Sequence, residues 1–109
     1  MIKNQKSKIK NQKALAVIPS RYGSSRFEGK PLALIAGNPM IQHVYERALQ
    51  SNVVKKAVVA TDDERILKTV TDFGGQAVMT SKACRSGTDR VAETAAMMGL
   101  GPDDLVINI

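Results

Sequence analysis

The sequence predicts an α/β protein with a Rossmann-like parallel sheet and helices on both faces of that sheet. Short, continuous apolar runs recur along the chain, as is typical of strands that are buried on both faces. Segments with apolar residues at helical spacing separate these runs. Strands that alternate with helices predict parallel pairing and right-handed crossovers. The expected strands are residues 14–18, 57–60, 76–79 and 105–109, of which 14–18 and 57–60 are apolar throughout.

The first strand is the apolar run 14–18, which Pro19 ends. A polar loop over residues 19–31 follows it, and residues 32–35 are expected to form a short extended piece. Gly37-Asn38 closes that piece, and we expect Pro39 in the first turn of a helix that continues to Leu49.

The second strand, residues 57–60, leads directly into a helix. Thr61 to Glu64 resembles a capping box and places acidic residues at the positive end of that helix. Its buried stripe is expected to contain Ile66, Leu67, Val70 and Phe73, with Gly74-Gly75 ending the helix.

A shorter strand over 76–79 and a loop over 80–87 come next. Ser86 or Thr88 is expected to cap a third helix. The residues of that helix expected to face inward are Val91, Ala92, Ala95 and Ala96. A turn over 99–104 leads to the last strand, 105–109.

Charge and composition divide the chain into a tail, residues 1–13, and one domain, residues 14–109. The tail contains five of the 16 basic residues and no acidic residue, so the net charge of +6 belongs mostly to the tail. We expect the tail to be disordered. It could be an arm for nucleic acid or a solvated extension, and the absence of aromatic residues for base stacking favours the extension.

Compartment follows from what the chain lacks. No apolar run approaches the roughly 20 residues that a membrane span needs. The single cysteine, Cys84, fits a reducing compartment. We therefore expect a cytoplasmic protein without a membrane partner.

The loop after the first strand is the most informative segment. Arg21, Arg26 and Lys30 lie within ten residues of one another, around Gly23, Ser24 and Ser25. Ligands of parallel sheets bind beyond the carboxyl ends of the strands, where this loop lies. Guanidinium groups, an ammonium group and backbone amides are suited to a polyphosphate. A solvated basic loop is the alternative, but this placement favours phosphate binding.

Residues 19–32 and later segments resemble the 3-deoxy-manno-octulosonate cytidylyltransferases, also called CMP-Kdo synthetases. The family opening, Pro-Ala/Ser-Arg-Tyr-x-Ser-Ser/Thr-Arg-Leu/Phe-Pro-Gly-Lys-Pro-Leu, is matched except at Glu28, where the family usually has Pro. CMP-sialic acid synthetases share such an opening, but Ser-Gly-Thr-Asp-Arg favours the Kdo enzymes. The further segments that match are residues 37–48, 60–64, 86–93 and 106–109.

This resemblance implies transfer of a cytidylyl group from CTP to Kdo with Mg²⁺, release of pyrophosphate, and a role in lipopolysaccharide biosynthesis. It implies a fold of the nucleotide-diphospho-sugar transferase type and a full-length homodimer. Arg21, Arg26 and Lys30 are the implied catalytic residues, through their hold on the triphosphate. The implied nucleotide-binding residues are Ser20, Arg21, Ser24, Arg26, Lys30, Ser86, Gly87 and Thr88.

The final strand resembles the family strand that precedes a Gln-Gly-Asp-Glu-Pro segment, whose Asp binds magnesium. We therefore expect the metal ligand beyond Ile109 and a truncated N-terminal half that is inactive alone. A non-catalytic CTP-binding module and a CMP-sialic acid synthetase-like enzyme are the alternatives.

Other polar residues have simpler expected roles. Asp89 and Arg90 are expected to fix the turn or cap the helix. We expect His43 to pack on its helix, and Asp62 and Asp63 to be caps and not metal ligands. Cys84 stands where the family usually has His, and it is expected to be an ordinary loop cysteine and not a thiol that Arg85 activates.

Overall fold

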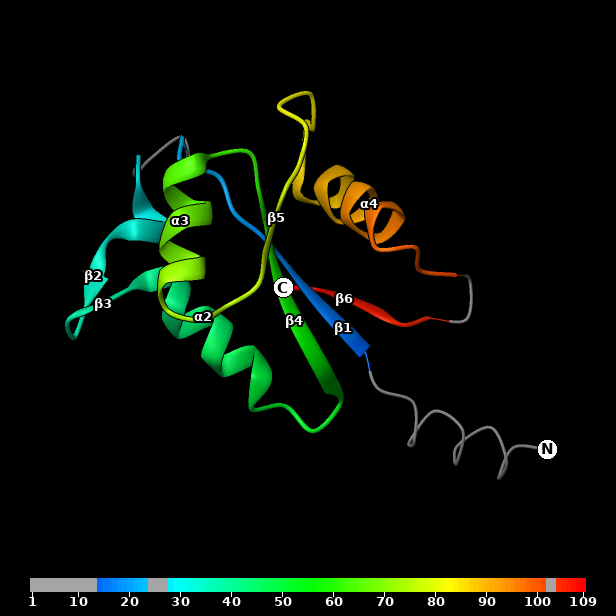
Figure 1. Ribbon diagram of the computed structural model, residues 1–109, viewed down its shortest axis with the longest axis horizontal. Coiled ribbons are helices and arrows are strands. Elements are labelled where there is room, and N and C mark those ends of the chain that lie inside the picture. Colours follow the sequence, from blue (N-terminus) through cyan, green and yellow to red (C-terminus); the bar gives the residue numbers. More distant parts are fainter. Residues whose placement is uncertain (1–13, 24–27, 102–103) are drawn as a thin grey trace.

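Four parallel strands form the central sheet of the computed structural model, which describes residues 14–23, 28–101 and 104–109. The order across the sheet is β5-β4-β1-β6 (Figure 1). The strands are β1 (Ala14–Pro19), β4 (Val54–Thr61), β5 (Ala77–Met79) and β6 (Val106–Asn108). The expected tail, residues 1–13, lies outside the described residues.

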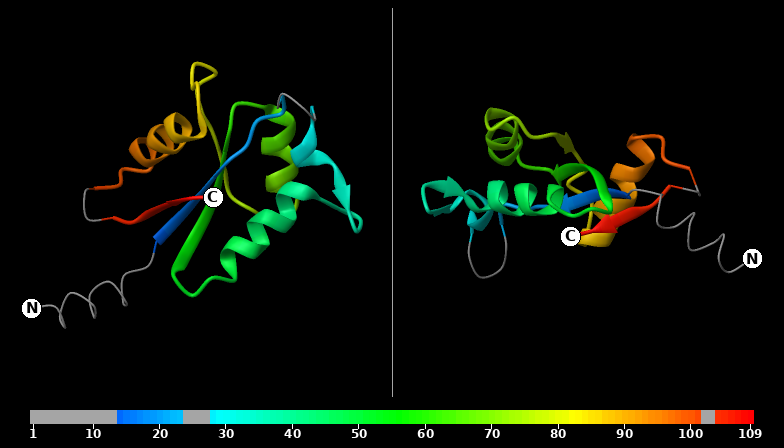
Figure 2. Two further views of the ribbon diagram at one scale, coloured as in Figure 1. Left: turned by 180° about the vertical axis from the view of Figure 1, so that it is seen from behind. Right: turned by 90° about the horizontal axis from the view of Figure 1, so that it is seen from below.

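Helices cover both faces of the sheet, which confirms the predicted fold class. Helices α2 (Met40–Leu49) and α3 (Glu64–Asp72) lie on one face, and α4 (Gly87–Met97) lies on the other. The further views agree in placing α4 apart from α2 and α3 (Figure 2). Within the described part of the chain, no helix is long and apolar enough to cross a membrane.

Strict alternation along β1 and β4 divides the core into two clusters. Ala16 and Ile18 pack with α2 and α3, whereas Leu15 and Val17 face α4. All four are at most 4% exposed, as expected for a central strand with neighbours on both edges. Burial on both faces explains why the sequence is continuously apolar here and does not alternate.

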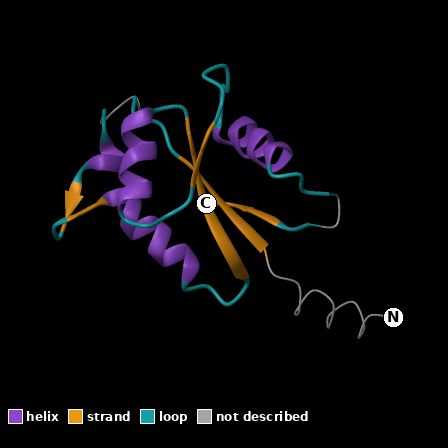
Figure 3. Ribbon diagram, viewed as in Figure 1, coloured by secondary structure: helices purple, strands orange, loops and turns teal. Residues whose placement is uncertain are grey.

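The segment between β1 and α2 differs from the prediction. A 3-10 turn, η1 (Lys30–Leu32), precedes a two-stranded hairpin of β2 (Leu34–Ile35) and β3 (Asn38–Pro39), which projects beside the helices (Figure 3). Ala36 and Gly37 both have positive φ, of 52° and 84°, as a tight two-residue hairpin turn requires.

Pro39 therefore ends a strand, and its expected place in the first helical turn is wrong. Its φ of −57° and ψ of 144° are extended, and α2 begins one residue later. The fixed φ of proline is compatible with both structures, so the residue type could not decide between them.

The cap of α3 also differs from the predicted capping box. Asp63 is the N-cap, and its Oδ1 accepts from the backbone N–H groups of Arg65 (2.8 Å) and Ile66 (3.3 Å). Thr61 belongs to β4, and its Oγ1 accepts from the N–H of Asp63 (3.1 Å). The expected role of Asp63 as a cap is confirmed.

Helix α4 has the expected cap and a different inward face. Ser86 is its N-cap and accepts from the N–H of Asp89 (3.1 Å). Arg90 and Thr94 are buried, whereas Ala92 and Ala96, which were expected to face inward, are exposed. The prediction is confirmed for Val91, which packs against the core, and is wrong for Ala92 and Ala96.

The cap of α3 provides a test of this local structure. Asp63→Ala is expected to lower the free energy of unfolding by about 1 kcal/mol at pH 7, because two N–H groups lose their acceptor. Urea denaturation followed by circular dichroism measures the difference.

This difference should depend on pH in one direction. The hydrogen bond from the Arg65 side chain, helped by the backbone bonds, lowers the pKa of Asp63 below its ordinary value of 3.8. The contribution is therefore complete above about pH 4 and is lost as the pH falls through the lowered pKa. A difference between wild type and Asp63→Ala that grows on acidification would contradict this assignment.

Candidate nucleotide-binding site

The carboxyl ends of the parallel strands gather polar residues at one edge of the sheet. Ser20 follows β1 and its N–H donates to the carbonyl oxygen of Ala60 on β4 (2.9 Å). Thr80 follows β5 and donates in the same way to Thr61 (2.8 Å). These bonds extend the ladder past the strands and fix the first residue of each loop.

The start of α4 packs against the end of β1. A Cβ atom added to Gly87 would lie 3.3 Å from Cγ of Pro19, so the absence of a side chain permits this close approach. The Ser86-Gly87 turn and the Pro19–Arg21 segment therefore lie together, although they are far apart in the sequence.

Two of the pockets at this edge adjoin each other and share Pro19 and Arg21. One, of about 260 Å³, is lined by Ser20, Arg21 and Lys30 together with apolar residues: Ile18, Pro19, Pro31, Met40, Ile41, Val44 and Ile109. The other, of about 330 Å³, is lined by Pro19, Arg21, Arg85, Ser86, Gly87 and Arg90. Arg21 thus stands between the Lys30 side of the edge and the turn at the start of α4.

Arg21 and Lys30 are exposed and are not paired with an acid within the described residues. Among the described residues, the side chain of Arg21 makes one long hydrogen bond, from Nη2 to the carbonyl oxygen of Gly23 (3.4 Å). Two cations at the end of a parallel strand, with their charges uncompensated, favour an anionic ligand.

The structure brings together five of the residues that the sequence predicted for nucleotide binding. Ser20, Arg21 and Lys30 share one pocket, and Ser86 and Gly87 line the adjoining one. Thr88 is exposed in the first turn of α4 and lines neither pocket. Ser24 and Arg26 lie outside the described residues, so the structure places two of the three cations, Arg21 and Lys30, at one pocket.

Arg90 is a buried cation at the base of the second pocket. It is 1% exposed, and Nη1 donates to Oγ1 of Thr80 (2.6 Å) while Nη2 donates to Oδ2 of Asp62 (3.4 Å). Nη1 also reaches the carbonyl oxygen of Ser81 (3.5 Å). These contacts tie α4 to the ends of β4 and β5, which agrees with the expected role of Arg90 in fixing the turn.

Asp89 fixes the turn from the other side, because its Oδ2 accepts from the N–H of Arg85 (3.1 Å). Arg85 lines the second pocket, a position that was not predicted from the sequence. Its basic side chain directly before Ser-Gly-Thr could have indicated a role in binding.

Cys84 is the ordinary loop cysteine that was expected. Burial, and then the hydrogen bond from Sγ to Oε1 of Glu93 (3.5 Å), raise the pKa of the thiol above its ordinary value. The alternative, a thiol activated by Arg85, is not supported, because burial and the carboxylate of Glu93 raise the pKa of the thiol. Glu93 also accepts from the N–H of Ser81 (2.7 Å) and so holds the loop.

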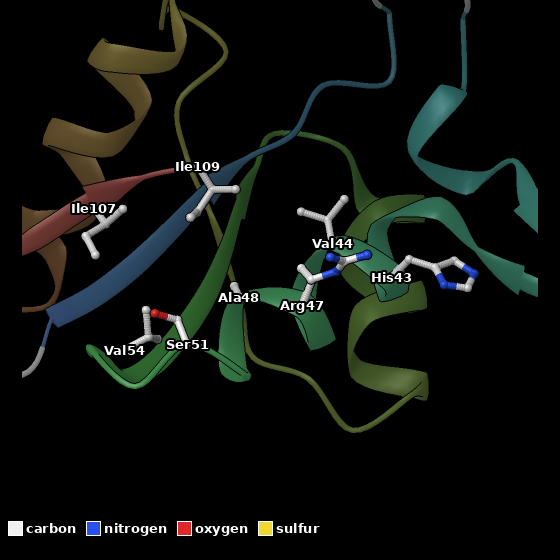
Figure 4. Close-up of a pocket in the computed structure, with 8 residues that line it drawn as sticks. All are labelled: His43, Val44, Arg47, Ala48, Ser51, Val54, Ile107 and Ile109. Carbon is white, nitrogen blue, oxygen red and sulfur yellow. The ribbon is translucent and has the colours of Figure 1, made fainter.

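His43 lies on α2, as expected, and its Nε2 is 2.6 Å from the carbonyl oxygen of Ile35 in the hairpin. It lines a pocket of about 470 Å³ between α2 and β6 (Figure 4), which shares Val44 and Ile109 with the pocket of Arg21 and Lys30. The wall of that pocket is mostly apolar, with Val44, Ala48, Ile107 and Ile109 among its residues. It is larger than either pocket beside Arg21 but lacks the polar strand ends that suit a nucleotide.

Magnesium was expected from the resemblance, with its ligand beyond Ile109. Among residues 14–23, 28–101 and 104–109, no group of three His, Cys, Asp or Glu side chains could hold a metal ion. Asp62 is engaged by Arg90 and Asp63 by Arg65, so the nearest carboxylates already have partners. These residues do not fit a metal centre, and we derive no step through one.

Comparison with solved structures defines the class of protein. The chain superimposes with a TM-score of 0.81 and 53% sequence identity on a CMP:2-keto-3-deoxy-manno-octonic acid synthetase complexed with CTP, over 90% of this chain and 39% of that one. A parallel α/β sheet at this level of identity places the chain in the nucleotidyltransferase fold class.

The family follows from the sequence comparisons. Residues 15–109 match the cytidylyltransferase family model, so the chain belongs to the cytidylyltransferase family. It is 64% identical over 97 residues to a 3-deoxy-manno-octulosonate cytidylyltransferase of Desulfosudis oleivorans. It is 60% identical over 95 residues to an 8-amino-3,8-dideoxy-manno-octulosonate cytidylyltransferase of Shewanella sp.. These matches cover 89% and 87% of the chain, which spans 39% of the length of each relative.

Arg90 offers a test of how the site is held together. Arg90→Met is expected to lower the free energy of unfolding by about 3–5 kcal/mol, because it leaves Asp62 and Thr80 without their buried partner. Lys68→Met is the control, because it breaks an exposed pair with Asp72 and should cost about 0.5 kcal/mol or less. Urea titrations of both variants give the comparison, and equal losses would contradict an anchoring role for Arg90.

Proposed function

We propose that this chain supplies the CTP-binding part of a CMP-Kdo synthetase, which joins CTP and Kdo to give CMP-Kdo and pyrophosphate. One observation carries the proposal: Arg21 and Lys30 border one pocket at the end of β1, next to the Ser86-Gly87 turn. The names of the relatives and the CTP in the similar structure support the choice of nucleotide and sugar.

The proposed chemistry uses the cations for charge neutralisation. The anomeric hydroxyl of the sugar attacks the α-phosphorus of CTP in line, the bond from the α-phosphorus to the bridging oxygen of the β-phosphate breaks, and the hydroxyl proton passes to solvent. Arg21 and Lys30 bind the triphosphate and stabilise the negative charge that grows on the departing pyrophosphate. A guanidinium group can donate two parallel hydrogen bonds to phosphate oxygens, so Arg21 would orient the triphosphate as well as attract it.

The remaining site residues complete this proposal. Ser20 and the Ser86-Gly87-Thr88 turn would contact the cytosine and ribose, with Ser24 and Arg26 adding to the phosphate grip. Mg²⁺ would bind to ligands outside residues 14–109. Because the chain spans 39% of the length of its relatives, turnover, homodimer formation and a place in lipopolysaccharide biosynthesis are proposals for the whole protein. The single cysteine suits a reducing compartment and supports a cytoplasmic location.

An 8-amino-3,8-dideoxy sugar is a second candidate acceptor, because several Shewanella relatives named for it are 58–60% identical to this chain. The two acceptors differ by an amine in place of a hydroxyl. Competition between the two sugars in a pyrophosphate-release assay of the whole protein separates these possibilities. A purely CTP-binding module would release no pyrophosphate with either.

CTP binding by the chain is the direct test. Isothermal titration with CTP should give a saturable signal, and Arg21→Ala and Lys30→Ala should each weaken binding by about 10- to 100-fold. Each loses a charge-assisted hydrogen bond worth roughly 1.5–3 kcal/mol.

Lys55→Ala is the matched control, because Lys55 is an exposed cation near the amino end of β4, at the opposite edge of the sheet. It should bind CTP as the wild type does. A folded chain that gives no signal with CTP would sink the proposal, as would equal losses in all three variants.

A further inference from the structure

Within the loop over residues 19–31, which carries the proposed phosphate-binding residues, Gly29 contacts the backbone and the aromatic ring of Tyr22. The N–H of Gly29 donates to the carbonyl oxygen of Tyr22 (2.7 Å). Gly29 has a φ of 77°, and a Cβ atom at this position would lie 3.1 Å from the Tyr22 ring. The ring therefore packs directly on the backbone where the loop returns.

Arg65, from the first turn of α3, covers the same ring. The carbon of its guanidinium group is 3.4 Å from the ring centroid of Tyr22, which is a close cation–π contact. Tyr22 is also half-buried against the core cluster that α2 and α3 share. The ring is thus fixed by the core, by Gly29 and by Arg65 together.

The guanidinium group of Arg65 is itself held in place. Its Nη2 and Nε donate to Oδ2 (2.7 Å) and Oδ1 (3.1 Å) of Asp63, the N-cap of α3. Hydrogen bonding to Asp63, with the negative charge of Glu28 as a smaller cause, raises the pKa of Arg65 above its ordinary value. This two-point bond orients the plane of the guanidinium group over the ring, while the Arg65 side chain as a whole is 58% exposed.

Position along the chain connects this contact to the site. Arg21 precedes Tyr22, and Lys30 follows Gly29, so the two free cations are the immediate neighbours of the clamped pair. Fixing Tyr22 on Gly29 fixes the backbone from which both cations project. A binding loop that is already held in its bound conformation binds its ligand more tightly, because less conformational entropy is lost on binding.

We propose that the stack of Arg65 on Tyr22 is a positioning device that sets Arg21 and Lys30 for CTP. Arg65 and Tyr22 are positioning residues, and the inference rests on the proposed CTP site. Two other roles predict different results. If Arg65 is only a surface residue, its substitution will leave the affinity for CTP unchanged. If Arg65 binds the phosphates itself, the effect of its substitution will be independent of Tyr22.

A double-mutant cycle on CTP binding separates these roles. Arg65→Ala and Tyr22→Leu should each lower the affinity for CTP about threefold to tenfold. The affinity of the double variant should equal that of the single variant that binds CTP less tightly. Tyr22→Phe keeps the ring and should bind like the wild type. Lys68→Ala, on the same helix and 77% exposed, is the control for loss of charge and should also bind like the wild type.

Several outcomes would overturn the inference. If the fold-losses of CTP affinity in Arg65→Ala and Tyr22→Leu multiply in the double variant, the two residues act independently. That result would indicate direct contact between Arg65 and the nucleotide. Full affinity in Arg65→Ala would show a surface role only. Far-UV circular dichroism and urea midpoints identify variants that have lost the fold, and for Tyr22→Leu the paired Tyr22→Phe result then decides. A wild-type chain that does not bind CTP would instead defeat the proposed function, so the two failures are distinguishable.

Discussion

Parallel pairing of β1 with both β4 and β6 is the constraint on which the rest of the structure depends. A strand with neighbours on both edges and helices over both faces must be apolar throughout, and Leu15, Val17 and Ile18 are at most 4% exposed. Because its neighbours run in the same direction, the loops that leave their carboxyl ends begin at one edge of the sheet. The chemistry of the site follows from this edge, where residues distant in the sequence become neighbours.

Two kinds of cation occupy that edge, and the partners of each define its role. Arg65 and Arg90 are bound to Asp63 and Asp62, and each contacts a loop or strand end that must stay in place. Arg21 and Lys30 have no acidic partner within the described part of the chain. A cation that is ion-paired with a carboxylate must break that ion pair before it can bind an anionic ligand, whereas an unpaired cation can bind the ligand directly. The structure thus separates the residues that build the site from those available to bind.

Hydrophobic periodicity was sufficient to predict every central strand and each helix, because burial on one or two faces leaves a direct pattern in the sequence. The errors arose where one residue type suits two structures. Pro39 fits a strand end or a first helical turn, and only pairing with Leu34 decides between them. In α4, Arg90 faces inward because Thr80 and Asp62 satisfy its donors, and those partners come from other elements. Local pattern cannot report a partner that only the tertiary fold supplies.

The same limit applies to the site. That Arg21 and Lys30 lie at one pocket could be predicted from the sequence, because they share one loop after one strand and their proximity is nearly local. Ser20 was predicted from the family resemblance. The stack of Arg65 on Tyr22 could not be found, since it depends on the β4–α3 connection placing a helix start beside the first loop. Residues that bind a ligand directly must have matching chemistry, and this leaves a motif. Residues that position them need only the right contact, and many sequences could provide one. A motif therefore identifies the binding groups, and the folded structure is needed to identify what holds them in register.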